Sequence, residues 1–346
     1  MSTTVLTPMP LHAGSLHLDE DSPRLTLARR LGRLFGIVSV AIAVTSVLVV
    51  FGLYGYMTWQ FTHPPVAALH TNPMSAKNLP YTDIAFPASG GGRMTDGWWI
   101  PAAGASARTV VLSHGFGANR EEYWVPMYDI AEMLHKQNYN VLMFDYGYAD
   151  PHHPTAATFG IDESKQLIGA LEYARGQGSR ELIVWGFSMG AGTALQAALQ
   201  TSLIDGMILD STFVTNADTI AFNLKRYGTL PTRLTMNLLS LFTPLWSGVR
   251  LDQIPSDQVQ STAYNFPLLL IHGTRDDKAP YEISERIAGA QRNADSSLWL
   301  VKDAIHEMVF RTHPEEYVKR TTAFLKTVDS DAASRHASNM GLLESA

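Results

Sequence analysis

A long uncharged run near the N-terminus is the first strong feature in the pattern of hydrophobic and polar positions. Residues 34–59 carry no charged side chain, and as a helix they would extend about 39 Å, against a hydrocarbon core of roughly 30 Å. The run is also longer than the apolar part of a signal peptide, which has roughly 7 to 15 residues. The pattern therefore predicts a transmembrane anchor helix at 23–62, between a disordered cytoplasmic tail at 1–22 and a linker at 63–80.

The residues beside this run predict how it is oriented. Four arginines lie between Pro23 and Leu34, whereas the next Lys or Arg after the run is Lys77. Positive flanks stay in the cytoplasm, so we expect a single-pass anchor with the catalytic domain outside the cytoplasm, in a periplasm or lumen. The aromatic residues Tyr54, Tyr56 and Trp59 suit the far interface. The alternative is a cleaved signal peptide, for which Val66-Ala67-Ala68 is a possible cleavage site.

Short apolar segments alternate with longer helical patterns over residues 81–328. Strands that alternate with helices predict an α/β fold with a mostly parallel, doubly wound sheet. Gly90-Gly91-Gly92 predicts a hairpin that adds an antiparallel edge. The expected strands are 81–87, 94–101, 109–113, 139–144, 183–187, 206–209, 266–271 and 297–301. The expected helices are 119–136, 162–176, 194–200, 280–291 and 314–328, followed by a polar tail at 329–346.

One insertion, residues 211–265, interrupts this alternation. It holds a group of apolar side chains between two expected strands: Leu234, Met236, Leu238, Leu239, Leu241, Phe242, Leu245 and Trp246. They fit a helix packed on the sheet, and they equally fit a small helical lid or acyl-binding wall over the active site. The two interpretations are compatible.

Composition excludes several kinds of chemistry. The chain has 346 residues, of which 46% are apolar and 17% charged, as in a protein with a substantial core. A net charge of −6 without a basic stripe argues against a nucleic-acid partner. The absence of cysteine rules out disulfides, thiolate catalysis and cysteine-based metal sites.

Metal and cofactor patterns are also missing. His306-Glu307 has no second histidine four residues after His306, and His152-His153 fits a solvated loop. Neither a Walker pattern nor a dinucleotide-binding glycine pattern occurs. We therefore expect no metal and no cofactor.

The most informative short motif is Gly186-Phe187-Ser188-Met189-Gly190, a G-x-S-x-G pentad between an apolar strand and a helix-forming run. Glycines permit the sharp strand-to-helix turn that exposes a nucleophilic serine. The pentad alone is weak, since Ser188 could simply be a small residue in a tight turn. Its context, and the acid and base that follow, favour a nucleophile.

A nucleophilic serine needs a base, and the base needs an orienting acid. Asp276 follows the apolar segment that ends at Gly273, and His306 follows the one that ends at Val301. Both lie after strands, where parallel strands direct loops to one edge. Asp277 and Asp210 remain alternative acids, and His114 an alternative base.

These motifs together make the chain resemble an α/β-hydrolase over about residues 80–328, similar to membrane-anchored ABHD-type and bud-emergence-type hydrolases. The matching segments are Leu112-Ser113-His114-Gly115-Phe116-Gly117, the Ser188 pentad, Leu209-Asp210-Ser211-Thr212-Phe213, and His272-Gly273-Thr274-Arg275-Asp276-Asp277-Lys278-Ala279-Pro280. The resemblance places the acid at Asp276, the base at His306, and the oxyanion hole at the backbone N–H groups of Phe116 and Met189. Asp145-Tyr146-Gly147 departs from the family's Asp-Tyr-Arg, which affects the expected shape of the pocket rim.

The resemblance implies a serine hydrolase that forms an acyl-enzyme and releases it with water. A carboxylic ester, from a small molecule or a lipid, is the expected substrate, since the anchor and the apolar insertion suit acyl chains. A peptidase is less favoured because no acidic site for a substrate's amino terminus is recognisable. An acyltransferase and a noncatalytic scaffold on the same fold are the remaining alternatives.

Overall fold

A computed structural model of the chain describes residues 23–224 and 231–344. The expected tail at 1–22 lies outside the described residues. The chain divides into two compact units, Met1–Leu53 and Tyr54–Ala346, which we describe separately. Helix α1 (Pro23–Thr62) has the range expected from sequence, and its residues 54–62 belong to the second unit.

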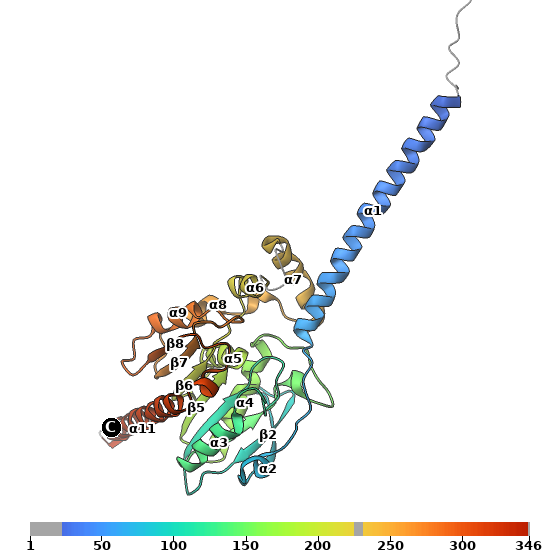
Figure 1. The fold of residues 1–346 in the computed structure, drawn as a ribbon. Helices are drawn as coiled ribbons and strands as arrows, with labels where there is room; N and C mark the ends of the chain where they lie inside the picture. The colour runs from blue at the N-terminus through green and yellow to red at the C-terminus, as the bar shows by residue number, and fades with distance from the viewer. Residues whose placement is uncertain (1–22, 225–230, 345–346) are drawn as a thin grey trace, which may run out of the picture. The chain divides into compact units, whose positions relative to one another are not determined.

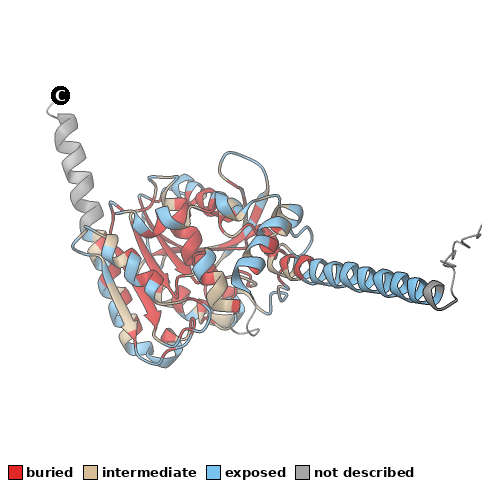
Figure 2. Cartoon of the chain, turned by 90° about the horizontal axis from the view of Figure 1, so that it is seen from above, coloured by how far each residue is buried: buried red, intermediate tan, exposed pale blue. Residues whose placement is uncertain are grey.

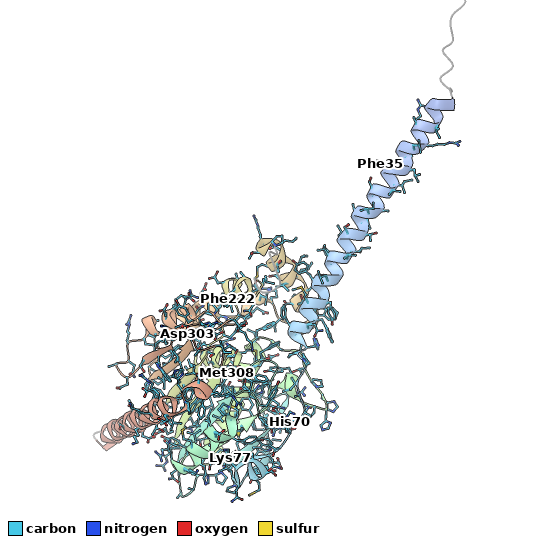
Figure 3. All side chains as sticks on the ribbon, viewed as in Figure 1. Phe35, His70, Lys77, Phe222, Asp303 and Met308 are labelled. Carbon is cyan, nitrogen blue, oxygen red and sulfur yellow. The ribbon has the colours of Figure 1, made fainter. Side chains whose placement is uncertain are left out.

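The first unit consists, where it is described, of the apolar part of α1. An 18-residue window within Leu27–Thr62 has a mean hydropathy of 2.7, and this is the one helix among the described residues that is long and apolar enough to cross a membrane. Its apolar side chains point outward on all sides, with Phe35 75% exposed (Figures 2 and 3). A helix that is apolar all round and not covered by protein is a candidate membrane span. Length and composition alone are weak evidence, so the anchor and its orientation stay predictions.

The second unit is built on one eight-stranded sheet with the order β1-β2-β4-β3-β5-β6-β7-β8 (Figure 1). Strand β2 pairs antiparallel with both β1 and β4, and all other neighbours are parallel. The mostly parallel sheet with an antiparallel edge is therefore confirmed. The strands are β1 (Thr82–Pro87), β2 (Met94–Ile100), β3 (Arg108–Ser113), β4 (Asn140–Phe144), β5 (Glu181–Phe187), β6 (Gly206–Asp210), β7 (Leu268–Gly273) and β8 (Ser297–Val301).

Helices cover both faces of this sheet, which explains the continuous apolar runs of its central strands. Alternate residues of β5 contribute to different cores: Val184 packs with helices α4 and α5, and Trp185 packs with α3 and α11. Figure 2 shows the strands buried between the two helical layers. The helices concerned are α3 (Met127–Lys136), α4 (Ile161–Gly176), α5 (Met189–Ala198), α9 (Glu282–Ala290), α10 (Val309–Thr312) and α11 (Pro314–Glu344).

Two predicted helix boundaries were wrong, and the expected linker contains an additional helix. The helix expected at 119–136 begins only at Met127, because residues 119–126 form turns whose side chains make long-range contacts. The last helix does not end at 328 but continues as α11 to Glu344 through the expected polar tail. The expected linker contains a short helix, α2 (Pro73–Lys77), which Asn72 caps by accepting a hydrogen bond from the N–H of Ser75 at 2.9 Å.

The insertion forms both a lid and a part of the core. Helix α8 (Ser256–Ser261) packs on α9, and a single turn, η3 (Leu251–Gln253), precedes it. Helices α6 (Ala217–Leu224) and α7 (Thr232–Ser247) instead contact the end of α1, and residues 225–230 between them are outside the described residues.

Three contacts fasten α7 to residues 54–62. The hydroxyls of Tyr54 and Thr235 hydrogen-bond at 2.7 Å, and the indole N–H of Trp246 donates to the Gly55 carbonyl at 3.0 Å. Tyr54 also joins Leu238 and Leu239 in a small apolar cluster. The lid helix is therefore held by the last turns of the apolar helix.

Candidate active site

Ser188 lies at the turn between β5 and α5, with φ +47° and only 7% exposure. A positive φ is uncommon for a residue with a side chain and indicates strain that its surroundings enforce. The Ser188 N–H donates to the Asp210 carbonyl at 2.9 Å, and the Ser188 carbonyl accepts from the Phe213 N–H at 3.0 Å. The turn is thus fixed by the end of β6.

The two glycines of the pentad are needed for close backbone approach. A Cβ at Gly186 would lie 2.6 Å from the Cα of Ala191, and one at Gly190 would lie 2.1 Å from the Ser113 carbonyl oxygen. Any side chain at either position would displace the helix from the sheet. The pentad therefore forms the sharp strand-to-helix turn that the sequence predicted for it.

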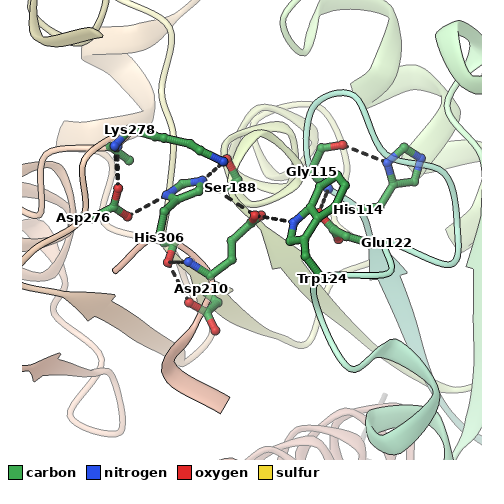
Figure 4. Close-up of polar contacts among 12 residues, drawn as sticks. His114, Gly115, Glu122, Trp124, Ser188, Asp210, Asp276, Lys278 and His306 are labelled. Atoms are coloured by element: carbon green, nitrogen blue, oxygen red, sulfur yellow. Dashed lines mark hydrogen bonds and ion pairs between the residues drawn. The ribbon is translucent and has the colours of Figure 1, made fainter. Parts of the chain in front are cut away.

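A chain of hydrogen bonds runs from Ser188 to Asp276 (Figure 4). The Ser188 Oγ lies 2.8 Å from His306 Nε2, and His306 Nδ1 lies 2.6 Å from Asp276 Oδ2. The three residues come from the loops that follow β5, β7 and β8. The structure therefore brings together the three side chains singled out from the sequence, although they are far apart in the chain.

The electrostatic surroundings of His306 and Asp276 suit a base and its orienting acid. Burial alone would raise the pKa of Asp276, but hydrogen bonds from His272 and His306 outweigh it and hold that pKa below its usual range. Burial lowers the pKa of His306, but the negative charge of Glu307 and the hydrogen bond to Asp276 outweigh that effect and raise it. Asp276 is thus ionised, and His306 is a stronger base than a free imidazole.

Asp276 has a second imidazole partner that sequence reasoning missed. His272 is fully buried on β7, with Nε2 at 3.1 Å from Asp276 Oδ2 and Nδ1 at 2.7 Å from Ser284 Oγ. The backbone N–H groups of Lys278 and Ala279 donate to the other oxygen of Asp276 at 2.9 and 2.8 Å. Four donors therefore fix the carboxylate.

The alternative acids and base have other surroundings. Asp277 is exposed. Asp210 accepts from the hydroxyls of Tyr317 and Ser211 at 2.8 and 2.9 Å, and burial raises its pKa to about 6. Burial lowers the pKa of His114 to about 4, so this ring is neutral.

His114 instead shapes the loop after β3. Its Nε2 accepts from the Tyr146 N–H at 3.1 Å, which leaves Nδ1 to donate to the Gly115 carbonyl at 3.0 Å. Tyr148 donates to the same carbonyl at 2.9 Å. These contacts position the segment that carries Phe116.

A cavity of about 330 Å³ opens beside Ser188 and His306. Phe116 and Met189, the residues expected to supply the oxyanion hole, line it. Its apolar walls come from the end of α1, from α6 and α7, and from the loops around the serine. They include Phe61, Phe159, Phe213, Ile220, Leu224, Leu239 and Leu251. The cavity can hold a hydrocarbon chain with its carbonyl at Ser188.

Two buried glutamates beside the serine were also missed. Glu122 and Glu307 are 1% and 3% exposed, and Glu307 lines the cavity. Nothing in the sequence distinguished them from surface acids, although Glu307 directly follows His306. Over the described ranges 23–224 and 231–344, no three His, Asp or Glu side chains are grouped as metal ligands, and His152 and His153 are exposed.

Comparisons with known proteins agree with this fold. A model of the alpha/beta hydrolase family matches residues 110–320. The uncharacterized protein YfhR of Escherichia coli O157:H7 is 26% identical over 274 residues, which cover 77% of this chain and 86% of that protein. The esterase Pf2001 of Pyrococcus furiosus superposes with a TM-score of 0.61 at 26% identity and covers 77% of this chain and 98% of its own. An esterase from Thermogutta terrifontis shares the fold at 17% identity, with a TM-score of 0.51 over 71% of this chain and 99% of its own.

Proposed function

Because this chain belongs to the α/β-hydrolase family, we propose that it is a serine hydrolase that cleaves carboxylic esters of acyl chains. The observation that carries the proposal is the hydrogen-bonded series of Ser188, His306 and Asp276 at the wall of an apolar cavity. Such a series is what a serine needs to act as a nucleophile near neutral pH.

The hydrogen bonds among Ser188, His306 and Asp276, together with the family resemblance, support the following reaction. His306 Nε2 takes the proton of Ser188 as its Oγ attacks the ester carbonyl, and the N–H groups of Phe116 and Met189 hold the oxyanion. Asp276 keeps the imidazole in the tautomer with a proton on Nδ1 and stabilises its cation. The alcohol leaves with the proton from His306, and water then releases the acyl group by the same steps.

The cavity walls favour a lipid acyl substrate. Thr58 and Phe61 of α1 line the cavity together with Leu239 and Thr243 of α7. Residues 58 and 61 at the end of the long apolar helix thus also form a wall of the site, and this wall suits the acyl chain of a lipid. The esterase activity named for the Pyrococcus furiosus protein supports ester hydrolysis over peptide hydrolysis.

A fluorophosphonate probe tests the proposed chemistry directly. Membranes that carry the intact protein should be labelled on Ser188, as located by peptide mass, and a Ser188→Ala variant should not be labelled. A folded wild-type protein that resists the probe would contradict the proposal and favour the noncatalytic scaffold. If Ser188 is labelled, activity assays with panels of esters, thioesters and acyl acceptors would distinguish hydrolysis from acyl transfer.

We also propose the orientation expected from the arginine flank, with the N-terminus cytoplasmic and the second unit outside. Because the chain has no cysteine, single introduced cysteines report topology without background. A membrane-impermeant maleimide added to intact cells or spheroplasts should label Lys319→Cys, whose native side chain is 78% exposed. It should not label Thr3→Cys until the membrane is permeabilised. The reverse pattern would show that the hydrolase domain is cytoplasmic.

A further inference from the structure

Two strained, buried glutamates lie against the nucleophile. Glu122 and Glu307 have φ values of +35° and +59°, in the left-handed region that residues with side chains rarely adopt. A Cβ at Gly115 would lie 2.5 Å from Glu122 Oε1, 2.8 Å from Glu307 Oε1 and 3.4 Å from the Ser188 Cβ, so both carboxyl groups meet beside the serine. Two strained backbone positions at one site indicate that the surrounding fold maintains this arrangement.

Glu122 is held in its neutral form. Burial, and after it the charge of Glu307, holds the pKa of the Glu122 carboxyl well above its usual range. The Glu122 carboxyl group is therefore neutral, and it lies beside the Glu307 carboxyl group. Glu122 Oε1 also accepts from the Gly115 N–H at 2.8 Å. Trp124 donates its indole N–H to Glu307 Oε2 at 2.7 Å (Figure 4).

Glu307 reaches the ring atom of His306 that exchanges the proton. Its Oε2 lies 3.8 Å from His306 Nε2, the nitrogen that is 2.8 Å from Ser188 Oγ. Asp276 contacts the opposite nitrogen. An imidazolium at this position would thus have a carboxylate on each side. At this separation, in a site largely excluded from water, opposite charges attract each other more strongly than they would in solution.

Other ionisable groups face the pair and His306 from the neighbouring elements. They are His272 and Lys278 on β7 and the loop after it, Asp210 at the end of β6, and Tyr317 on α11. Lys278 acts on His306 in the opposite direction to Glu307, and Asp210 is bound to Tyr317 and Ser211. Glu307 is the residue whose charge raises the basicity of His306 most.

We propose that Glu307, held by the indole of Trp124 and packed beside Glu122, is a second anionic partner of His306 and stabilises the imidazolium formed when His306 takes the Ser188 proton. It is a positioning residue that acts through His306, and the inference rests on the proposed serine-hydrolase function. Substitution of Glu307 should therefore alter the pH dependence of the reactivity of Ser188. A loss of packing alone would not alter that pH dependence.

The test measures the rate of Ser188 phosphonylation by a fluorophosphonate against pH, with the full chain in detergent. Glu307→Gln removes the charge and keeps the size, so the acid limb should move to lower pH by about one unit, and the plateau rate should fall by about tenfold. Glu122→Gln is the matched variant. Its amide can still accept from Gly115 and donate to Glu307, so its acid limb should stay at the wild-type pH.

A third variant tests whether the effect of Glu307→Gln arises from the lost charge and not from misfolding. Glu307→Asp keeps the charge but withdraws it by one methylene, and Asp tolerates a positive φ better than Glu, so its acid limb should move in the same direction by less. An unmoved acid limb in folded Glu307→Gln or Glu307→Asp, or an equal shift in Glu122→Gln, would overturn the inference while leaving the hydrolase proposal intact. A wild-type protein without label at any pH would overturn both.

Discussion

Replacing Asp276 by asparagine is expected to lower the rate of ester hydrolysis by roughly 10⁴-fold, with little change in fold. The reason is that one oxygen of the Asp276 carboxylate already accepts hydrogen bonds from the backbone. Asp276 Oδ1 accepts from the N–H groups of Lys278 and Ala279, so an asparagine would keep its carbonyl oxygen there. Its NH₂ group would then face His306 Nδ1, which would have to become an acceptor. The proton would move to Nε2, and His306 could no longer accept one from Ser188.

The neighbouring Asp277 provides the matched control for this change. It is exposed, so Asp277→Asn should retain hydrolysis within about twofold of the wild-type rate. Initial rates with a short-chain p-nitrophenyl ester, compared at equal amounts of folded protein, distinguish the two residues. A large loss in Asp277→Asn together with an active Asp276→Asn would move the role of the acid to the other carboxylate.

The parts of the fold that sequence predicted well are those in which one strong physical constraint acts locally. Strands β3 to β7 are buried on both faces and therefore read as short, continuous apolar runs. The order in which Ser188, Asp276 and His306 follow three such runs was enough to place them at one edge of the sheet. That reasoning used only the positions where strands end.

What sequence could not predict depends on contacts between distant segments. Residues 119–126 contain good helix formers, but Glu121 accepts from the backbone N–H groups of His70 and Thr71 at 2.7 and 2.9 Å, and Glu122 bonds to Gly115. These long-range bonds outweigh local helix propensity. The roles of His272 and Glu307 were hidden for the same reason, since each depends on partners that the fold alone brings close.

The end of α11 was predicted wrongly for a different reason. The apolar periodicity stops near Val328, which is buried against the sheet, and the following residues are polar. Loss of that periodicity marks where a helix stops contacting the core, and it does not mark where the helix ends. Residues 329–344 include several alanines and no proline, and the helix continues through Gly341 to Glu344.

The second large effect concerns stability and comes from the turn segment before α3. Arg120 and Asp145 form a buried pair, with side chains 8% and 5% exposed and an Nη2–Oδ2 distance of 2.7 Å. Asp145 Oδ1 also accepts from the Arg120 backbone N–H at 2.6 Å, and the guanidinium lies 4.9 Å from the centre of the Trp98 ring. One side chain thus joins residues 119–126 to the ends of β4 and β2, next to the loop that carries Phe116.

Arg120→Met should therefore lower the free energy of unfolding by about 3–5 kcal/mol, because it leaves the Asp145 carboxylate buried without its counter-charge. Lys165→Ala, which breaks an exposed pair with Asp162, is the matched control and should cost about 0.5 kcal/mol or less.

The double variant Arg120→Met/Asp145→Asn should regain part of the loss, because no unpaired charge remains while the asparagine oxygen can still accept from the residue 120 N–H. Denaturation midpoints of the full chain in detergent, followed by tryptophan fluorescence, measure all four proteins. If Arg120→Met were no more destabilising than Lys165→Ala, water would have to reach Asp145, and the loop that carries Phe116 would be held by the His114 contacts and not by this ion pair.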